Sequence, residues 1–238
     1  AHIIQNCLRE SGLPADAVQL IESIDRIVVE SMLKMRDHID LLIPRGGADL
    51  VSKVAAEATM PAITGGIGVC HTYVDSAANV DMATSITYNA KTQRPSVCNA
   101  LDTILVHSHI ASVFLPKMFA VMDKAGVELR CDSRALSIIG SNGSDQVKRA
   151  NAEDYGQEFL SLVASVKIVD SLGEALAHIE TFGSGHSEAI ITEDHDTATR
   201  FVDEVDASAV FVNASTRFND GGEFGLGAEV AILSLIHI

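Results

Sequence analysis

One of the four cysteines, Cys98, stands among residues that thiol chemistry uses. It follows a loop with Lys91, Arg94 and Pro95, and it precedes an apolar run over residues 103–106. The thiolate is the nucleophilic form, and nearby cations or the free N–H groups of a helix start stabilise it. Lys91 and Arg94 are close enough in sequence to supply the cations, and a helix N-terminus at Cys98 would supply the N–H groups. The segment predicts an activated nucleophile, and a small buried hydrophobic side chain is the alternative.

The other three cysteines, Cys7, Cys70 and Cys131, form no C-x-x-C pair and no spacing typical of a disulfide framework. This usage suits a reducing cytoplasm. His71 follows Cys70 directly, and neighbouring residues of a strand point to opposite faces. The two side chains therefore cannot act together as nucleophile and base, and Cys70 is expected to pack in the core.

A second candidate site is the turn formed by Arg45, Gly46 and Gly47. It follows an apolar run over residues 39–43 and precedes a helical pattern over residues 48–58. A strand, a glycine turn and a helix start together make an anion site, because free N–H groups and the helix dipole point at the turn. Two glycines in an ordinary connection explain the pattern equally well, so the turn alone does not establish a nucleotide site.

The chain is acidic, with 32 Asp and Glu against 17 Lys and Arg in 238 residues and a formal charge of −15. Such a surface repels nucleic acid and anionic membrane, so neither is expected as a partner. An anionic substrate would need locally gathered cations. Arg217 follows a predicted strand end, where α/β proteins form sites, and its guanidinium can hold a carboxylate through two hydrogen bonds. A surface ion pair is the alternative for Arg217.

Apolar patterns of helical and strand period alternate along the chain. We expect helices over residues 26–35, 48–58, 77–87, 111–125, 172–181 and 194–205. We expect strands over residues 18–21, 39–43, 60–63, 69–74, 103–107, 127–131, 160–169, 189–192 and 209–212, and an exposed loop over 141–145. This alternation is typical of an α/β fold with mostly parallel sheets and flanking helices. No run reaches transmembrane length, no signal-peptide pattern begins the chain, and no metal site is predicted.

Three segments resemble, in the same order, motifs of the gamma-glutamyl phosphate reductase family of the aldehyde dehydrogenase superfamily. They are residues 89–103, NAKTQRPSVCNALDT; residues 169–190, VDSLGEALAHIETFGSGHSEAI; and residues 212–229, VNASTRFNDGGEFGLGAE. The resemblance covers about residues 1–232. It implies an aldehyde dehydrogenase-like fold, with residues 1–65 as the C-terminal part of an NADP-binding domain and residues 66–232 as the catalytic domain. Residues 233–238 depart from the family and are suspected to be an artefact.

The resemblance implies NADPH-dependent reduction of L-glutamyl 5-phosphate to L-glutamate 5-semialdehyde, with phosphate release, in proline biosynthesis. Cys98 would form a thioester with the glutamyl group. The cofactor would be held by Arg45, Gly46, Gly47 and Glu158, and the substrate by Lys91, Arg94 and Arg217. Lys91 and Arg94 are better placed for phosphate, and Arg217 for the alpha-carboxylate. A solvated glutamate is the alternative for Glu158, and His186 and Ser187 receive no catalytic step.

Ile63 supports reduction over aldehyde oxidation. Aldehyde-oxidising relatives carry a glutamate at this position, which activates water to hydrolyse the thioester. An enzyme that keeps its thioester for hydride should not offer water a general base. The resemblance also implies a cytoplasmic homo-oligomer at full length that works with glutamate 5-kinase, as a separate or fused protein. The alternatives are another acyl-reducing or aldehyde-oxidising member of the superfamily and a catalytically inert fragment with poor cofactor binding.

Overall fold

A computed structural model describes residues 1–140 and 145–227. The chain divides into two compact units, Ala1–Thr64 and Gly65–Ile238, and each is considered by itself. Most of the expected loop at 141–145 and the whole of the suspected tail at 233–238 lie outside the described residues. None of the described helices is long and apolar enough to cross a membrane.

The first unit is mainly helical. Its elements are α1 (His2–Glu10), the 3-10 helix η1 (Ala15–Ala17), α2 (Arg26–Met32) and α3 (Ala48–Glu57). The strand expected over residues 18–21 is wrong, because the Val18 carbonyl accepts a hydrogen bond from the Gln5 side chain instead of pairing with another strand. The strands expected at 39–43 and 60–63 reduce to one parallel bridge between Leu42 and Ala62. Two short segments without further neighbours form a marginal sheet.

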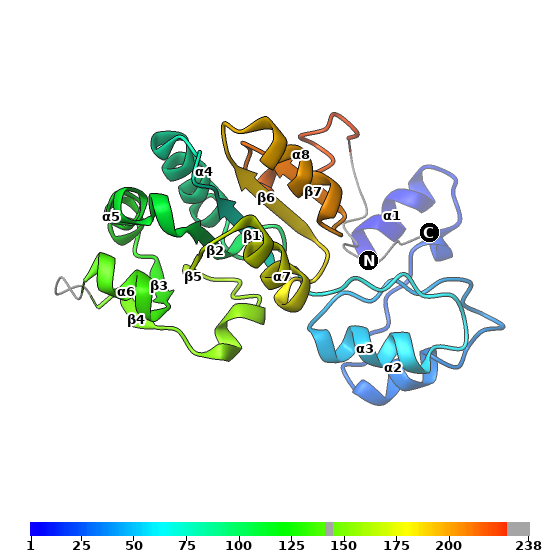
Figure 1. Ribbon diagram of the computed structural model, residues 1–238. Helices are drawn as coiled ribbons and strands as arrows, with labels where there is room; N and C mark the ends of the chain where they lie inside the picture. The colour runs from blue at the N-terminus through cyan, green and yellow to red at the C-terminus, as the bar shows by residue number, and fades with distance from the viewer. Residues whose placement is uncertain (141–144, 228–238) are drawn as a thin grey trace. The chain divides into compact units, whose positions relative to one another are not determined.

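The second unit contains a parallel sheet of seven strands in the order β4-β3-β5-β2-β1-β6-β7, which Figure 1 shows. The strands are β1 (Cys70–Val74), β2 (Leu101–His107), β3 (Glu128–Cys131), β4 (Val147–Arg149), β5 (Val163–Val169), β6 (Ser187–Ile191) and β7 (Ala209–Val212). All six neighbouring pairs are parallel. The expected α/β fold with parallel pairing and flanking helices is confirmed.

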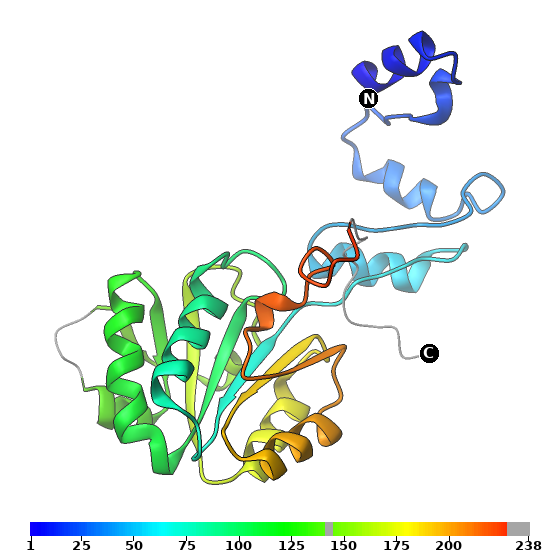
Figure 2. The ribbon, with the colours of Figure 1, turned by 90° about the horizontal axis from the view of Figure 1, so that it is seen from above.

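Helices pack on both faces of this sheet (Figure 2). One face carries α4 (Val80–Thr92), α5 (Ser108–Lys124) and α6 (Ser133–Ile139), and the other carries α7 (Leu172–Phe182) and α8 (His195–Glu204). Two short 3-10 helices, η2 (Ala152–Gly156) and η3 (Thr216–Phe218), lie in connections. Central strands covered on both faces bury side chains on both faces, and apolar runs such as residues 104–106 of β2 follow from this.

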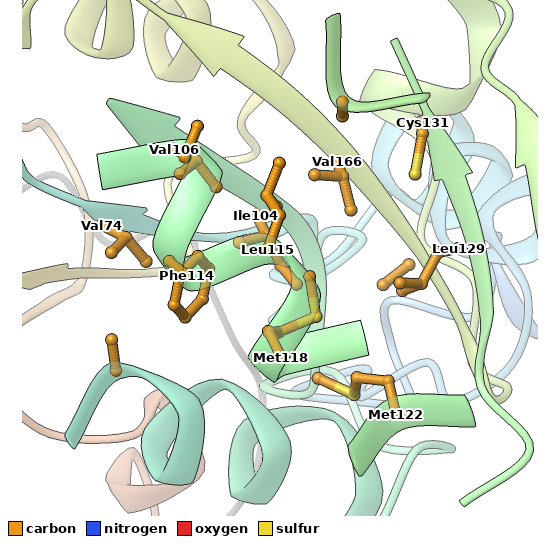
Figure 3. Packing of buried hydrophobic residues seen from close by; sticks show 14 of the residues in the cluster. Val74, Ile104, Val106, Phe114, Leu115, Met118, Met122, Leu129, Cys131 and Val166 are labelled. Atoms are coloured by element: carbon orange, nitrogen blue, oxygen red, sulfur yellow. The ribbon is translucent and has the colours of Figure 1, made fainter. Parts of the chain in front are cut away.

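The larger core lies between the sheet and α4, α5 and α6, and Figure 3 shows its packing. Strand residues such as Ile104 and Val166 pack against Phe114, Leu115 and Met118 of α5, and all five side chains are fully buried. A smaller core on the opposite face contains Tyr73, Leu105, Val169, Ile190 and Phe201. Alternation along each strand sends neighbouring side chains into different cores. The two cores fix the strand ends from which the connecting turns emerge.

Candidate active site

Cys98 lies half-buried in the turn that joins α4 to β2. No helix begins there, so a helix N-terminus is not the source of N–H groups for the thiolate. The backbone N–H groups of Cys98 and Asn99 face the sulfur instead. Burial raises the pKa of the Cys98 thiol and the Glu158 carboxylate adds to this, while the two N–H groups and Arg217 oppose it. The expectation that Lys91 and Arg94 favour the thiolate is therefore wrong.

The structure places Lys91 inside the protein. Helix α4 continues to Thr92, beyond the expected end at residue 87, and this puts Lys91 in its last turn. The side chain is 0% exposed, and Nζ donates a hydrogen bond to the Leu101 carbonyl at 2.8 Å. The Asp102 carboxylate lies 3.7 Å away. A contact between Lys91 and a substrate phosphate is thus wrong, because the ammonium group is fully covered and already paired.

Arg217 reaches the nucleophile turn through Asn99. The Arg217 guanidinium donates to Asn99 Oδ1, and Thr216 Oγ1 donates to the Asn99 carbonyl at 2.7 Å. Asn99 Nδ2 in turn donates to the Asn219 carbonyl at 2.9 Å. Asn99 was not predicted as a site residue, and only its place next to Cys98 in the first motif pointed to it.

Arg94 and Arg217 form the positive side of the site. Arg94 is exposed in the turn after α4, and its charge helps to lower the pKa of Arg217, after the larger effect of burial. The Arg217 charge also lowers the pKa of Cys98. Within the described residues, Arg217 Nε is buried and has no hydrogen-bond partner. A donor of this kind is costly unless an acceptor binds it.

The site lies at the amino ends of the strands. Cys70 begins β1, Ser187 begins β6, and Cys98 precedes β2. The segment after β7 reaches this edge again, where Asn219 Nδ2 donates to Ser187 Oγ at 2.8 Å. Arg217 does follow the end of β7, as expected, but its neighbour Thr216 bonds to the turn before β2, so the site itself is not at the carboxyl ends of the strands.

Glu158 and Gly68 contact each other beside Cys98. Glu158 Oε1 accepts a hydrogen bond from the Gly68 backbone N–H at 3.1 Å. A Cβ atom built on Gly68 would lie 2.1 Å from the Cys98 carbonyl oxygen and 2.9 Å from Cys98 Cβ. The structure brings together Cys98, Glu158 and Arg217 of the predicted residues. Gly68 was missed, because close approach to a residue 30 positions along the chain leaves no local sequence signal.

His186 and Ser187 lie next to Cys70, and Cys70 contacts the nucleophile turn. His186 Nδ1 and Ser187 Oγ are 2.7 Å apart, and the Cys70 thiol donates to the Cys98 carbonyl at 3.2 Å. Burial lowers the pKa of His186 to about 4, so its imidazole is neutral at neutral pH. On the other side of β1, His71 Nδ1 lies 3.1 Å from the buried Glu188 carboxylate. The Cys70 and His71 side chains therefore point to opposite faces of β1, as expected.

Replacing Gly68 with alanine is expected to move the nucleophile. The new methyl group would collide with backbone atoms of Cys98, and these cannot rotate away as a flexible side chain would. A displacement of about 1 Å can cost roughly 100-fold in rate. We expect kcat/KM to fall about 10- to 100-fold. Gly173→Ala is the matched control, since its added Cβ would meet only Ser171 Oγ at 3.7 Å. Equal activities of the two variants would contradict the close approach.

A model of the aldehyde dehydrogenase family matches residues 1–153. The chain belongs to this family. It is 53% identical over 232 residues to the gamma-glutamyl phosphate reductase of Dehalococcoides mccartyi, which covers 98% of the chain and 55% of the relative. It is also 53% identical over 230 residues to that of Escherichia coli O7:K1, covering 97% and 55%. The chain thus spans about half the length of the curated relatives that it matches.

Solved structures agree with the aldehyde dehydrogenase fold. The crystal structure of gamma-glutamyl phosphate reductase from Thermotoga maritima is 42% identical, with a TM-score of 0.90, and the match covers 99% of this chain and 56% of that one. An engineered glycolyl-CoA reductase with bound NADP+ has a TM-score of 0.70 at 18% identity, covering 95% and 57%. At that identity the likeness concerns the fold alone.

Aldehyde dehydrogenase family membership implies a nucleotide cofactor, and the turn at residues 45–47 suits an anionic group. Gly47 caps α3 without a side-chain hydrogen bond, so the first N–H groups of this ten-residue helix are not capped by it. A Cβ on Gly47 would meet nothing within 4 Å, and Arg45 is exposed. These residues belong to the first unit, and Cys98 and Glu158 belong to the second.

Replacing Lys91 with methionine is expected to destabilise the second unit by about 3–5 kcal/mol at neutral pH, because Asp102 would stay buried without its cation. Burial raises the pKa of Asp102 to about 6 although Lys91 opposes the shift. Below that pH the carboxyl takes up a proton in the folded state and the pair is lost in the parent chain too. The difference between variant and parent should therefore shrink as the pH falls through 6.

Urea unfolding followed by circular dichroism on both sides of pH 6 checks this expectation. Lys117→Met is the matched control, because Lys117 pairs with Asp81 at the surface, where both side chains are at least 51% exposed. Its effect should be far smaller. A similar loss in both variants, or a loss for Lys91→Met that grows as the pH falls, would contradict a buried charge pair.

Proposed function

We propose that the chain carries the nucleophile unit of a gamma-glutamyl phosphate reductase. The reaction is NADPH-dependent reduction of L-glutamyl 5-phosphate to L-glutamate 5-semialdehyde, with release of phosphate, in proline biosynthesis. The observation that carries the proposal is the 53% identity to reductases of this name over 98% of the chain. The placement of Cys98 near the Glu158 carboxylate and the Arg217 guanidinium supports it.

Cys98 supplies the covalent step. Its thiolate attacks the acyl carbon of the substrate, so a carbon–sulfur bond forms while the bond to the phosphate oxygen breaks and phosphate leaves. The carbonyl oxygen gains negative charge during this attack. The Cys98 N–H group already faces the sulfur and is a candidate donor to that oxygen. Because burial raises the pKa of Cys98, a thiolate has to be stabilised when the substrate is bound.

Two arginines are proposed to hold the two anionic groups of the substrate. Arg217 has an unpaired, buried Nε–H within the described residues, which suits the alpha-carboxylate. Arg94 is exposed, its charge acts on Arg217, and it is assigned to the phosphate. Asn99 holds Arg217 beside the nucleophile turn, so binding of the alpha-carboxylate there would help to orient the acyl carbon toward the sulfur.

Each unit, taken by itself, has residues that are proposed to bind NADP(H). In the first unit, Arg45, Gly46 and Gly47 offer a cation and uncapped N–H groups to phosphates. In the second unit, Glu158 offers its second carboxylate oxygen to a ribose hydroxyl. When bound, the nicotinamide supplies the hydride that reduces the thioester. Ile63 cannot take a proton from water, so it gives no help to hydrolysis.

An assay with L-glutamyl 5-phosphate and NADPH tests the proposed function. We expect phosphate and NADP+ to form in equal amounts, and no phosphate to appear with a free aldehyde and NADP+. Oxidation of several aldehydes without any reaction of glutamyl phosphate would favour another member of the family. No reaction and no binding of NADPH at millimolar concentration would favour a catalytically inert chain.

We also propose a cytoplasmic location, a homo-oligomer at full length and glutamate 5-kinase as the working partner. An acyl phosphate is reactive, so an enzyme that makes it and one that consumes it gain from working together. Gel filtration of the full-length protein with and without the kinase tests the homo-oligomer and the kinase partner, and fractionation of the source cells tests the location. A monomer that reduces glutamyl phosphate equally well from free solution would overturn the homo-oligomer and the kinase partner.

A further inference from the structure

We propose that Asp102 is a positioning residue that fixes the segment carrying Glu158 beside Cys98. The inference rests on the proposed function, in which Cys98 is the nucleophile. It concerns a buried carboxylate whose partners are Lys91 and the backbone N–H groups of Cys70 and Phe159.

Asp102 occupies an irregular position in the sheet. Cys70 pairs with Leu101 and His71 pairs with Thr103, so Asp102 is the extra residue of a bulge in β2. Bulges re-aim a side chain next to many active sites. The Asp102 side chain is 2% exposed, Oδ1 accepts from the Phe159 N–H at 3.1 Å, and Oδ2 accepts from the Cys70 N–H at 3.4 Å. One carboxylate therefore joins the amino end of β1 to the segment before β5.

Phe159 makes contacts through its aromatic ring as well as through its backbone N–H. Lys91 Nζ lies 5.9 Å from the ring centroid and the Arg130 guanidinium lies 5.0 Å from it. The next residue, Leu160, has φ 51°, a left-handed conformation that costs about 1–2 kcal/mol for a residue with a branched side chain. Such a conformation persists only where neighbouring contacts impose it. The segment is thus held at Phe159, the residue next to Glu158.

The position of Glu158 affects the nucleophile Cys98 in turn. Its carboxylate contacts the Gly68 N–H, and its charge is the largest effect after burial in raising the pKa of Cys98. Among the described residues, the charged or titratable groups that influence Cys98 are Glu158, Arg217 and Cys70. Those that influence Asp102 include Lys91 and Glu158. Releasing the segment should therefore move the Glu158 charge away from Cys98.

The rate of Cys98 alkylation by iodoacetamide measures this displacement without substrate or cofactor. Peptide mapping separates Cys98 from the other three cysteines, and the rate is followed across a pH series on the full chain. Glu158→Gln should raise the rate near neutral pH about threefold, because more thiolate forms while each thiolate becomes somewhat less nucleophilic. Asp102→Asn should raise it by a similar factor, since the amide offers one oxygen in place of two and sets an N–H group against either the Phe159 N–H and Lys91 or the Cys70 N–H.

The double variant distinguishes positioning from a direct charge effect. If Asp102 acts by holding Glu158, then Asp102→Asn in the Glu158→Gln background should change the rate by less than about 1.5-fold. Multiplicative effects, or an unchanged rate in Asp102→Asn alone, would overturn the proposal. An unchanged rate in Glu158→Gln would overturn it as well.

Folding of each variant is checked by circular dichroism. Should Asp102→Asn not fold, Asp102→Ser provides the same comparison. The smaller serine side chain places no N–H group against the backbone N–H groups of Cys70 and Phe159. These outcomes are separate from the proposed function. A chain that does not reduce glutamyl phosphate can still show the alkylation pattern, and a working reductase can lack it.

Discussion

Replacing Cys98 with alanine is expected to reduce turnover of L-glutamyl 5-phosphate by about 10⁴-fold or more. The sulfur is the atom that bonds to the substrate, and among the cysteines only Cys98 is half-buried in a turn next to Glu158 and Arg217. NADPH binding should stay nearly unchanged, since the thiol adds little to ground-state binding. Steady-state kinetics and a fluorescence titration of NADPH on the full-length protein measure the two effects.

Two other cysteines serve as controls for Cys98. Cys7→Ala should leave turnover unchanged, because Cys7 is exposed in the first unit. Cys70→Ala should give a smaller loss than Cys98→Ala, because its thiol only donates to the Cys98 carbonyl from a fully buried position. Retained turnover in Cys98→Ala would refute its role as the nucleophile.

Replacing Arg217 with alanine is expected to lower kcat/KM by about 30- to 1,000-fold, the equivalent of about 2–4 kcal/mol for a charge-assisted pair. The substrate would lose the partner of its alpha-carboxylate, and Asn99 would lose the guanidinium that fixes its side chain. Alkylation of Cys98 should persist. Kinetics with glutamyl phosphate and peptide mapping of the alkylated protein check both statements.

Arg134→Ala is the matched control for Arg217. Arg134 forms an exposed pair with Asp170 on the α6 side of the sheet, with side chains 46% and 55% exposed. Removing it should leave kcat/KM within about twofold, since surface pairs contribute little. A wild-type kcat/KM in Arg217→Ala would contradict the proposed contact between Arg217 and the alpha-carboxylate. A loss of kcat/KM together with loss of Cys98 alkylation would indicate collapse of the turn instead.

The sequence was informative wherever a local pattern decides the structure. Apolar runs such as the one in β2 need two covered faces, and that requirement alone predicts a parallel sheet with helices on both sides. The run at residues 18–21 failed because a short apolar stretch becomes a strand only if another strand pairs with it. The bridge between Leu42 and Ala62 shows the same dependence on neighbours that local sequence cannot supply.

The site was predicted in part. The motif around Cys98 led to the correct turn, and the third motif led to Arg217, which bonds to the residue after the nucleophile. Lys91 was misassigned because sequence spacing cannot tell an exposed cation from one that a further helical turn buries. Gly68, Asn99 and Asp102 act through contacts with distant segments. Their importance depends on distances that only the folded chain defines.

A thioester on Cys98 is the central claim, and mass spectrometry tests it most directly. The full-length protein is mixed with L-glutamyl 5-phosphate in the absence of nucleotide, quenched in acid and digested. The account predicts one glutamyl group on the peptide that contains Cys98, one equivalent of phosphate released per chain, and protection of Cys98 from later alkylation. Phosphate release without any acyl group on Cys98, or an acyl group on a different residue, would contradict it.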